Sequence, residues 1–271
     1  GTMKLPGNIN SNAATIVLDG AGSQLLNASS TNALASFASN TASGSFTIKN
    51  GKELTTAGAF SNAGNMNIAA GSRFTAGSDG MAAYTQSAGA TTVNGVLTAG
   101  SLSITGGTLS GSGTIDASVI SSVAVAPGMS PGMLTIDGDY TQTAAGSLLI
   151  ELGGYIQGTG YDYLSINGDA TLAGTLEIFL YGGFAPSDGS VFDILTADKI
   201  VGTLDAFITP DPAWIWGVSY LDTDEDSYWD TVRVSANRET PGPGEVPEPA
   251  TLLLLSLRLL SLIRARKRNS R

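Results

Sequence analysis

The chain has 271 residues, of which 35 are glycine, and a formal net charge of −10, with neither cysteine nor histidine. The lack of cysteine excludes a disulfide framework, and the lack of histidine removes the commonest general base and transition-metal ligand. Six of the 13 basic residues lie from Arg258 onward, so the preceding part, with 7 bases and all 23 acids, has a net charge of −16. Such a surface repels phosphates, which excludes DNA or RNA as a partner.

Residues 14–180 repeat short alternating strands separated by glycine- or asparagine-containing turns. In Phe46–Ile48, and twenty positions later in Met66–Ile68, two apolar residues stand two apart and face one side of a strand. The same spacing recurs at Leu102–Ile104, Val123–Val125, Leu134–Ile136, Leu148–Ile150, Leu164–Ile166 and Leu176–Ile178. This rung-like repeat of about 20 residues predicts an all-β fold, a right-handed parallel β-solenoid over residues 1–180. An antiparallel β-sandwich or jelly roll is the alternative.

Residues 106–207 add a second signal, in the segments GGTLSGSGTI, APGMSPGMLTIDGDYTQTAAGSLLIELGG, YDYLSINGDATLAGTLEI and FDILTADKIVGTL. This part resembles the autotransporter-type β-helix repeats of large bacterial surface proteins. It departs from them at Met129, where such repeats often carry asparagine between the two Pro-Gly pairs. The resemblance implies a β-helix carried by a surface protein.

The segment from Gly128 to Gly132 has the G-x-S-x-G spacing of a hydrolase nucleophile elbow. No histidine is present to deprotonate Ser130, and Pro131 lacks the backbone N–H that would complete an oxyanion hole. The two Pro-Gly pairs instead predict consecutive tight turns. No catalytic residue is expected here.

A lyase or glycosidase built on a β-helix would need clustered carboxylates with a basic residue on one face. The acidic residues of the repeats that could serve are Asp137, Asp139, Asp162 and Asp169. They mostly adjoin glycine or aromatic turn positions, and no lysine or arginine shares their strand pattern. This context favours turn formation over catalysis.

Residues 181–237 concentrate aromatic side chains around an acidic turn. Ala213–Leu221 and Trp229–Ala236 are expected to form a β-hairpin that caps the last open coil. The aromatic residues are Trp214, Trp216, Tyr220, Tyr228 and Trp229. They are interpreted as cap or core, with a carbohydrate-stacking surface as the alternative.

The acidic turn places carboxylates at alternate positions, as a calcium loop does. The candidate ligands are Asp222, Asp224, Asp226 and Asp230. Ser227 stands where an EF-hand has glycine and Arg233 where it has glutamate, which excludes an EF-hand. A looser calcium site and a solvated acidic turn remain the two interpretations, and no other cofactor is expected.

The end of the chain has three parts in order. A Pro/Gly linker over 238–249 ends in Pro247, Glu248 and Pro249; an apolar segment spans 250–263; and a basic tail spans 264–271. The basic residues that follow the apolar segment include Arg264, Arg266, Lys267 and Arg268. An apolar helix followed by arginine and lysine indicates membrane insertion with a cytoplasmic basic end. The segment is short for a hydrocarbon core of about 30 Å and contains Arg258, which favours transient insertion.

This three-part tail resembles the PEP-CTERM sorting signal of Gram-negative, exopolysaccharide-producing bacteria. The resemblance implies an exosortase-type membrane protease as partner, an inner-membrane intermediate, and delivery to the cell surface or extracellular matrix. Residues 1–24 lack the basic and then apolar pattern of an export signal, which we therefore expect to precede Gly1 in the full protein.

The function expected from these features is that of a non-enzymatic structural or adhesive protein of the cell surface or biofilm matrix. Extracellular polysaccharide is the expected contact, because hydroxyl and amide side chains dominate the repeats. The alternatives are a carbohydrate-active β-helix enzyme, either a lyase or a glycosidase, and an autotransporter passenger-like adhesin.

Overall fold

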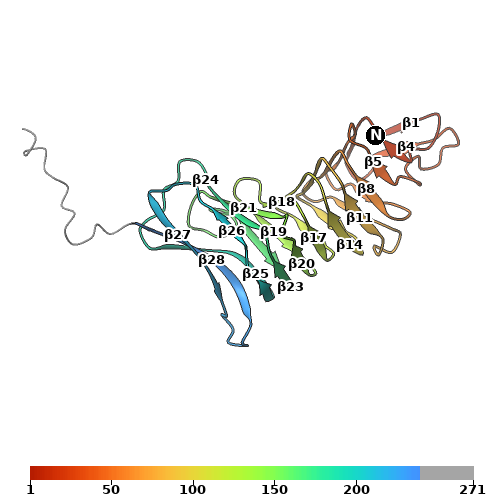
Figure 1. Cartoon of the computed structure of the whole chain (residues 1–271). Coiled ribbons are helices and arrows are strands. Elements are labelled where there is room, and N and C mark those ends of the chain that lie inside the picture. The colour runs from red at the N-terminus through yellow and green to blue at the C-terminus, as the bar shows by residue number, and fades with distance from the viewer. Residues whose placement is uncertain (239–271) are drawn as a thin grey trace, which may run out of the picture. The chain divides into compact units, whose positions relative to one another are not determined.

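The computed structural model describes residues 1–238, and Gly1–Asn237 form one compact unit. All elements in this part are β-strands, and they stack as successive coils along one axis (Figure 1). Because the coils pair in parallel, the predicted β-solenoid is confirmed and the antiparallel sandwich or jelly roll is wrong. Within residues 1–238 there is no helix that is both long and apolar enough to cross a membrane. The predicted helix over 250–263 lies outside the described residues.

Each complete coil contributes one strand to each of three faces. The first face is a nine-stranded sheet of β3 (Thr15–Asp19), β6 (Ser45–Lys49), β9 (Asn65–Ile68), β12 (Ala90–Val93), β15 (Thr108–Gly111), β18 (Ala124–Pro127), β21 (Ser147–Leu152), β24 (Thr175–Leu180) and β26 (Ala206–Ile208). The second face consists of β7 (Glu53–Thr55), β10 (Arg73–Thr75), β13 (Val96–Thr98), β16 (Thr114–Asp116), β19 (Met133–Ile136), β22 (Tyr163–Ile166) and β25 (Ser190–Gly202). The third face consists of β2 (Ser11–Asn12), β5 (Ser39–Asn40), β8 (Phe60–Asn62), β11 (Ala83–Gln86), β14 (Ser101–Ile104), β17 (Val119–Ser121), β20 (Tyr140–Gln142) and β23 (Asp169–Leu172).

The apolar pairs of the sequence lie inside the solenoid and form ladders from coil to coil. Phe46 stacks in register on Met66, and Ile48 on Ile68, and all four side chains are buried. Val123 is the exception among the predicted pairs, because it is only half-buried and lies just before β18. Burial of such a side chain contributes roughly 1.5–3 kcal/mol, but only when the neighbouring coil is in place.

The coils differ in length, although the sequence suggests a regular repeat. On the first face, 16 positions separate Thr108 from its partner Ala124, whereas 31 separate Thr175 from Ala206. The strands themselves keep their register, so the additional residues lie in the corners between faces. The fold therefore tolerates long corner loops without disturbing the stacked strands.

A row of buried amides runs along the third face where that face turns into the first. The Asn12 amide nitrogen donates to Asn40 Oδ1 at 2.9 Å, Asn40 donates to Asn62 Oδ1 at 2.9 Å, and Asn62 donates to Gln86 Oε1 at 3.4 Å. The Gln86 amide nitrogen continues the row to the backbone carbonyl of Gly106 at 2.9 Å. These side chains pair with one another and with corner carbonyls, which satisfies polar groups that water does not reach.

At the C-terminal end, the sheet that forms the second and third faces ends in strands that change direction, while the first face ends in the parallel strand β26. The long strand β25 pairs in parallel with both β22 and β23, and β28 (Trp229–Arg238) then pairs with it antiparallel. β27 (Trp214–Leu221) belongs to the same sheet, and its Trp216, Val218 and Tyr220 pack against the core. The predicted hairpin thus corresponds to β27 and β28, while parallel stacking continues beyond residue 180 through β25 and β26.

The N-terminal end has a different construction. β1 (Thr2–Lys4) pairs in parallel with β4 (Gln24–Leu26) as a separate two-stranded sheet. Among the strands of residues 1–238, β3 pairs only with β6 and is the terminal strand of the first face.

Replacing one amide of the buried row should destabilise the chain strongly. We expect Asn40→Ala to lower the free energy of unfolding by about 2–4 kcal/mol, because Asn12 and Asn62 each lose a partner in a buried site. Urea unfolding followed by circular dichroism measures the shift. The matched control is Ser39→Ala on the same strand, which removes only an exposed hydroxyl contact with Ser11 and should stay within about 0.5 kcal/mol. Equal effects of the two substitutions would contradict a stabilising role of the row.

Candidate functional site

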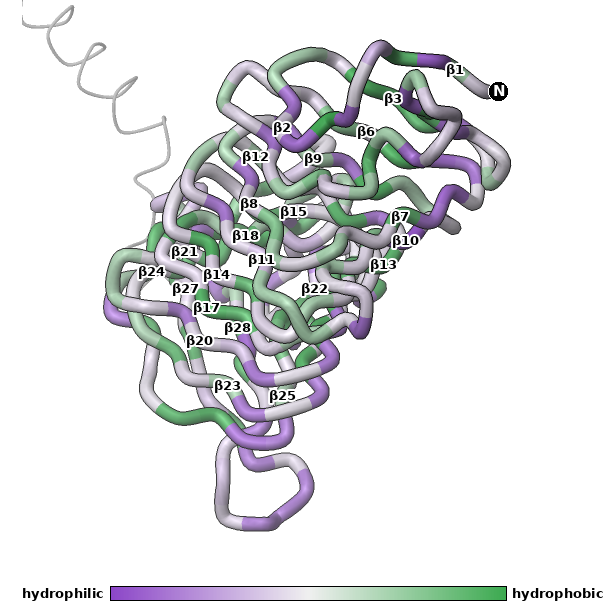
Figure 2. The backbone as a smooth tube through the Cα atoms, turned by 90° about the vertical axis from the view of Figure 1, so that its right-hand side faces the viewer, coloured by the Kyte–Doolittle hydropathy of each residue, from purple (hydrophilic) through white to green (hydrophobic). Residues whose placement is uncertain are grey.

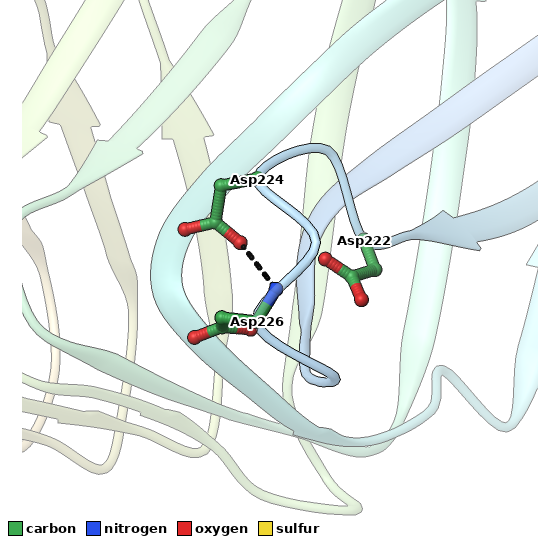
Figure 3. Close-up of side chains that lie close together, drawn as sticks. All are labelled: Asp222, Asp224 and Asp226. Atoms are coloured by element: carbon green, nitrogen blue, oxygen red, sulfur yellow. Dashed lines mark hydrogen bonds between the residues drawn. The ribbon is translucent and has the colours of Figure 1, made fainter.

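The loop between β27 and β28 carries the acidic cluster predicted from the sequence. One carboxylate oxygen from each of Asp222, Asp224 and Asp226 lies within 4.8 Å of the others, and all three residues are exposed. Figure 3 shows these side chains around the bend of the loop, which projects as a hydrophilic segment from the end of the solenoid in Figure 2. Oxygen ligands in this arrangement suit a hard cation such as calcium.

The same carboxylates also fold the loop. Asp222 Oδ2 accepts from the Ser227 amide at 3.0 Å, Asp224 Oδ1 from the Asp226 amide at 3.3 Å, and Asp226 Oδ1 from the Tyr228 amide at 2.8 Å. Each aspartate thus holds a backbone N–H a few residues further along, as short polar side chains do in turns. One oxygen of each carboxylate is therefore engaged in a hydrogen bond within the loop.

Asp230, the fourth predicted ligand, does not join this cluster. Its carboxylate accepts from the Thr223 amide at 2.6 Å, from the Thr223 hydroxyl at 2.9 Å and from the Asp224 amide at 3.3 Å. Burial opposes ionisation of Asp230, but hydrogen bonds from Thr231 and Thr223 outweigh it and lower its pKa below the ordinary value. Asp230 fastens the base of the loop, and the candidate cation ligands are reduced to the other three.

The aromatic residues of the hairpin divide between core and surface. Trp216 and Tyr220 pack against the core, and the Tyr220 hydroxyl accepts from the Leu204 amide at 2.7 Å. Trp229 and Tyr228 are 43% and 48% exposed; Trp229 lies against Tyr220, and the Lys199 ammonium stands 3.8 Å from the centre of the Tyr228 ring. The capping interpretation therefore fits the inner rings. Trp214 is partly exposed, and Tyr228 and Trp229 have the largest exposed surface for stacking among the five hairpin aromatics.

The Pro-Gly turn after β18 is held by the buried carboxylate of Asp162, one of the four repeat aspartates that the sequence assigns to turns. Asp162, 2% exposed, accepts from the Gly132 amide at 2.8 Å and from the Glu151 amide at 2.9 Å, which ties two corner loops together. Burial raises the pKa of Asp162 to about 7, although the two hydrogen bonds act in the opposite direction and lower it. Gly128 is required beside it, because a Cβ there would lie 2.4 Å from Asp162 Oδ1 and the backbone φ is +94°.

The other repeat aspartates also serve turns. Asp139 Oδ1 accepts from the Asp169 amide at 3.0 Å, and Asp137 accepts from the side-chain amide of Asn167 one coil away. These contacts join adjacent coils at exposed corners, as the turn interpretation predicts.

The remaining predicted site residues lie outside the described residues. These are Pro247, Glu248 and Pro249 of the sorting motif, and Arg264, Arg266, Lys267 and Arg268 of the basic tail.

A calcium site in the acidic loop predicts a ligand-dependent melting temperature. Calcium at about 5 mM should raise the midpoint relative to chelator, because the ion would bridge carboxylates that otherwise repel one another. Asp224→Asn should remove the difference, whereas Asp116→Asn on the solenoid should keep it. Identical midpoints with calcium and with chelator would leave the loop as a solvated turn.

Because the carboxyl of Asp162 is buried, we expect the free energy of unfolding to depend on pH near neutrality, a range in which histidine is usually the residue that titrates. Its pKa rises from 3.8 to about 7 on folding, so its favourable contribution is complete below about pH 4 and is lost as the pH rises through about 7. Thermal unfolding between pH 5 and 8 should show a falling midpoint, and Asp162→Asn should flatten this fall. Asp116→Asn, at an exposed position, is the control; an unchanged slope in Asp162→Asn would contradict the assignment.

Comparison with known proteins assigns the chain to no family: no family model matches it, and no curated protein matches it.

Proposed function

We propose that the chain is an exported, non-enzymatic protein with a structural or adhesive role at the bacterial cell surface or in the extracellular polysaccharide matrix. The tail would direct it there through an exosortase-type protease. The observation that carries the molecular role is the uninterrupted stack of coils, which gives a long and polar surface on a rigid core.

The outward residues of the third face support this role. Ser39, Ser61, Thr85 and Ser103 follow one another in register on successive coils. Their spacing is that of neighbouring strands, about 4.8 Å. Small hydroxyl side chains on a rigid sheet lose little conformational entropy on contact and can exchange hydrogen bonds with hydrated sugars.

Exposed aromatic rings near the end of the solenoid support polysaccharide as the partner. Trp229 and Tyr228 are the two hairpin rings that are about half exposed, and sugar rings stack on such faces. The acidic surface favours neutral or cation-bridged polysaccharides over strongly anionic ones, because like charges repel.

A non-enzymatic role is supported by how the repeat carboxylates are used. Asp162 is buried beneath two corner loops, and Asp139 holds an amide of the next coil. Glycoside hydrolysis needs two carboxyl groups that flank a substrate bond in an open groove. These aspartates instead perform structural tasks, and the chain has no histidine to act as a base.

Export and sorting rest on the tail. Pro247, Glu248 and Pro249 precede an apolar segment and a basic end, and this order is what an exosortase-type enzyme would recognise. The short apolar segment with Arg258 suits a signal that is inserted and then removed.

The sorting proposal predicts cleavage at the tail. Fused behind an export leader and produced in an exosortase-containing Gram-negative host, the chain should appear outside the cell. Intact mass should show that it has been cut at or near Pro247–Pro249. Replacing Pro247, Glu248 and Pro249 by alanine should retain it in the membrane. Replacing Pro241 and Pro243, the linker prolines outside the motif, should not. Recovery of the mature product from the cytosol with Arg271 attached would contradict the proposal.

A further inference from the structure

The corner between the first and second faces changes over three successive coils. Between β12 and β13 it consists of Asn94 and Gly95 alone. The corresponding loops that follow β18, β21 and β24 are longer and span residues 128–132, 153–162 and 181–189 (Figure 1). Because a two-residue corner is enough for the strands to stack, the additional residues of these loops are available for another task.

The three loops, together with Met133, form one continuous surface, which we call the corner platform. A Cβ on Gly153 would lie 3.2 Å from Cδ1 of Tyr181 and 3.3 Å from Cγ of Pro131, so all three loops meet at Gly153. The large apolar side chains of the platform are exposed, and they are Met129, Met133, Tyr155, Ile156 and Tyr181. Single exposed apolar residues are ordinary, whereas a contiguous group of them indicates a binding surface.

The ring of Tyr155 is held in place although the residue is 54% exposed. Its hydroxyl donates to Ser187 Oγ at 3.0 Å and accepts from the Ser187 amide at 2.8 Å. The ring centre lies 5.1 Å from that of Phe184, and the ring is parallel to the buried Phe192 within 7°. A ring fixed in this way loses little conformational entropy when a ligand stacks on it.

The polar groups of the platform suit a neutral ligand that is rich in hydroxyl groups. The three loops contain no lysine or arginine; of their two acids, Asp162 is buried and Asp188 is exposed. Their exposed uncharged polar side chains include Gln157, Thr159 and Ser187. Amides and hydroxyls both donate and accept hydrogen bonds, as sugar hydroxyls do. Without a base the platform cannot neutralise an anionic ligand, and the acidic chain around it repels one.

We propose that the corner platform binds a neutral polysaccharide chain, with six-membered sugar rings stacked on Tyr155 and Tyr181. This assignment rests on the proposed function and locates the contact with polysaccharide. Successive coils are about 4.8 Å apart, close to the length of one unit in an extended chain of such sugars, about 5 Å. A chain that lies along the solenoid axis therefore brings successive rings onto the loops of adjacent coils, and its hydroxyls reach Gln157 and Ser187.

Binding to a soluble neutral polysaccharide tests the platform. The full-length chain, kept in a polyoxyethylene detergent that carries no sugar, should be retarded in native gels that contain hydroxyethylcellulose. Tyr155→Ala and Tyr181→Ala should each weaken binding about tenfold or more, because a stacking ring is lost. Ile120→Ala, at a similarly exposed apolar position on the third face, should bind as the unsubstituted chain does. Carboxymethylcellulose, which has the same backbone with negative charges, should bind at least about tenfold more weakly.

The unsubstituted chain gives an independent test, since Tyr155 also supports its own loop. Tetranitromethane nitrates exposed tyrosines, and peptide masses report the rate at each position. Hydroxyethylcellulose at about ten times its Kd should slow nitration of Tyr155 and Tyr181 several-fold. Nitration of Tyr228, an exposed ring of the hairpin, should continue at its original rate.

The outcomes separate this inference from the proposed function. If both tyrosine variants bind normally and only Tyr228 is protected, the platform is excluded while a polysaccharide-binding role stands. If the folded chain binds no polysaccharide, both are contradicted. Self-association that Tyr155→Ala abolishes, without any polysaccharide binding, would identify a second copy as the occupant and overturn the inference. Stronger binding of carboxymethylcellulose would overturn a neutral ligand.

Discussion

The stacking of parallel strands at a fixed spacing of about 4.8 Å is the constraint on which this structure depends. Between the terminal coils, an inward side chain has the equivalent residue of the next coil on one side and that of the previous coil on the other. Phe46, Met66 and Thr91 occupy one such row, and Leu109, Val125, Leu148 and Leu176 continue it. The row contains side chains of different size and polarity. Thr91 is accommodated because its hydroxyl bonds to the buried Tyr84 at 2.8 Å. Stability therefore accumulates from nearest-neighbour contacts and requires several coils together.

The buried side-chain amides show how polar groups are satisfied inside the stacked coils. Where the chain turns from the third face into the first, corner carbonyls point inward and cannot reach water. An asparagine can bond to the equivalent asparagine of the next coil and also to its own corner, as Asn40 does with Asn62 and with the Gly44 carbonyl. The longer Gln86 and Gln142 perform the same task further along, and each lies two residues after a buried tyrosine. A hydrophobic residue there would leave the corner carbonyls unpaired.

The sequence predicts the strands and the solenoid well because both depend on local spacing. Apolar residues two apart, such as Leu134 and Ile136, identify a strand and its inner face without knowledge of its neighbours. The assignment of strands to faces was beyond prediction, since corner loops of unequal length shift the repeat. For the same reason the sequence does not predict the row of amides, because Asn12, Asn40 and Asn62 are unequally spaced along the chain. Acidic residues gave a mixed outcome. Asp222, Asp224 and Asp226 cluster as predicted and also accept from amides of their own loop. Asp230 and Asp162 lie outside the cluster and bond to other backbone amides, because the fold brings those amides close to them.

The two ends of the solenoid show what a parallel stack needs in order to stop. A strand with an unused edge can always accept another strand, so large side chains alone do not terminate the sheet. At the C-terminal end the chain reverses direction. β25 spans two faces, its register with β28 shifts near Asp193 and Thr196, and Arg233 of β28 pairs with the Asp193 carboxylate. This reversal ends the parallel stacking along β25. The first face has no such reversal among the described residues: its terminal strands, β3 and β26, pair in parallel with β6 and β24. A reversal of chain direction therefore ends the stacking on one part of the coil while another part keeps the parallel arrangement to its last strand.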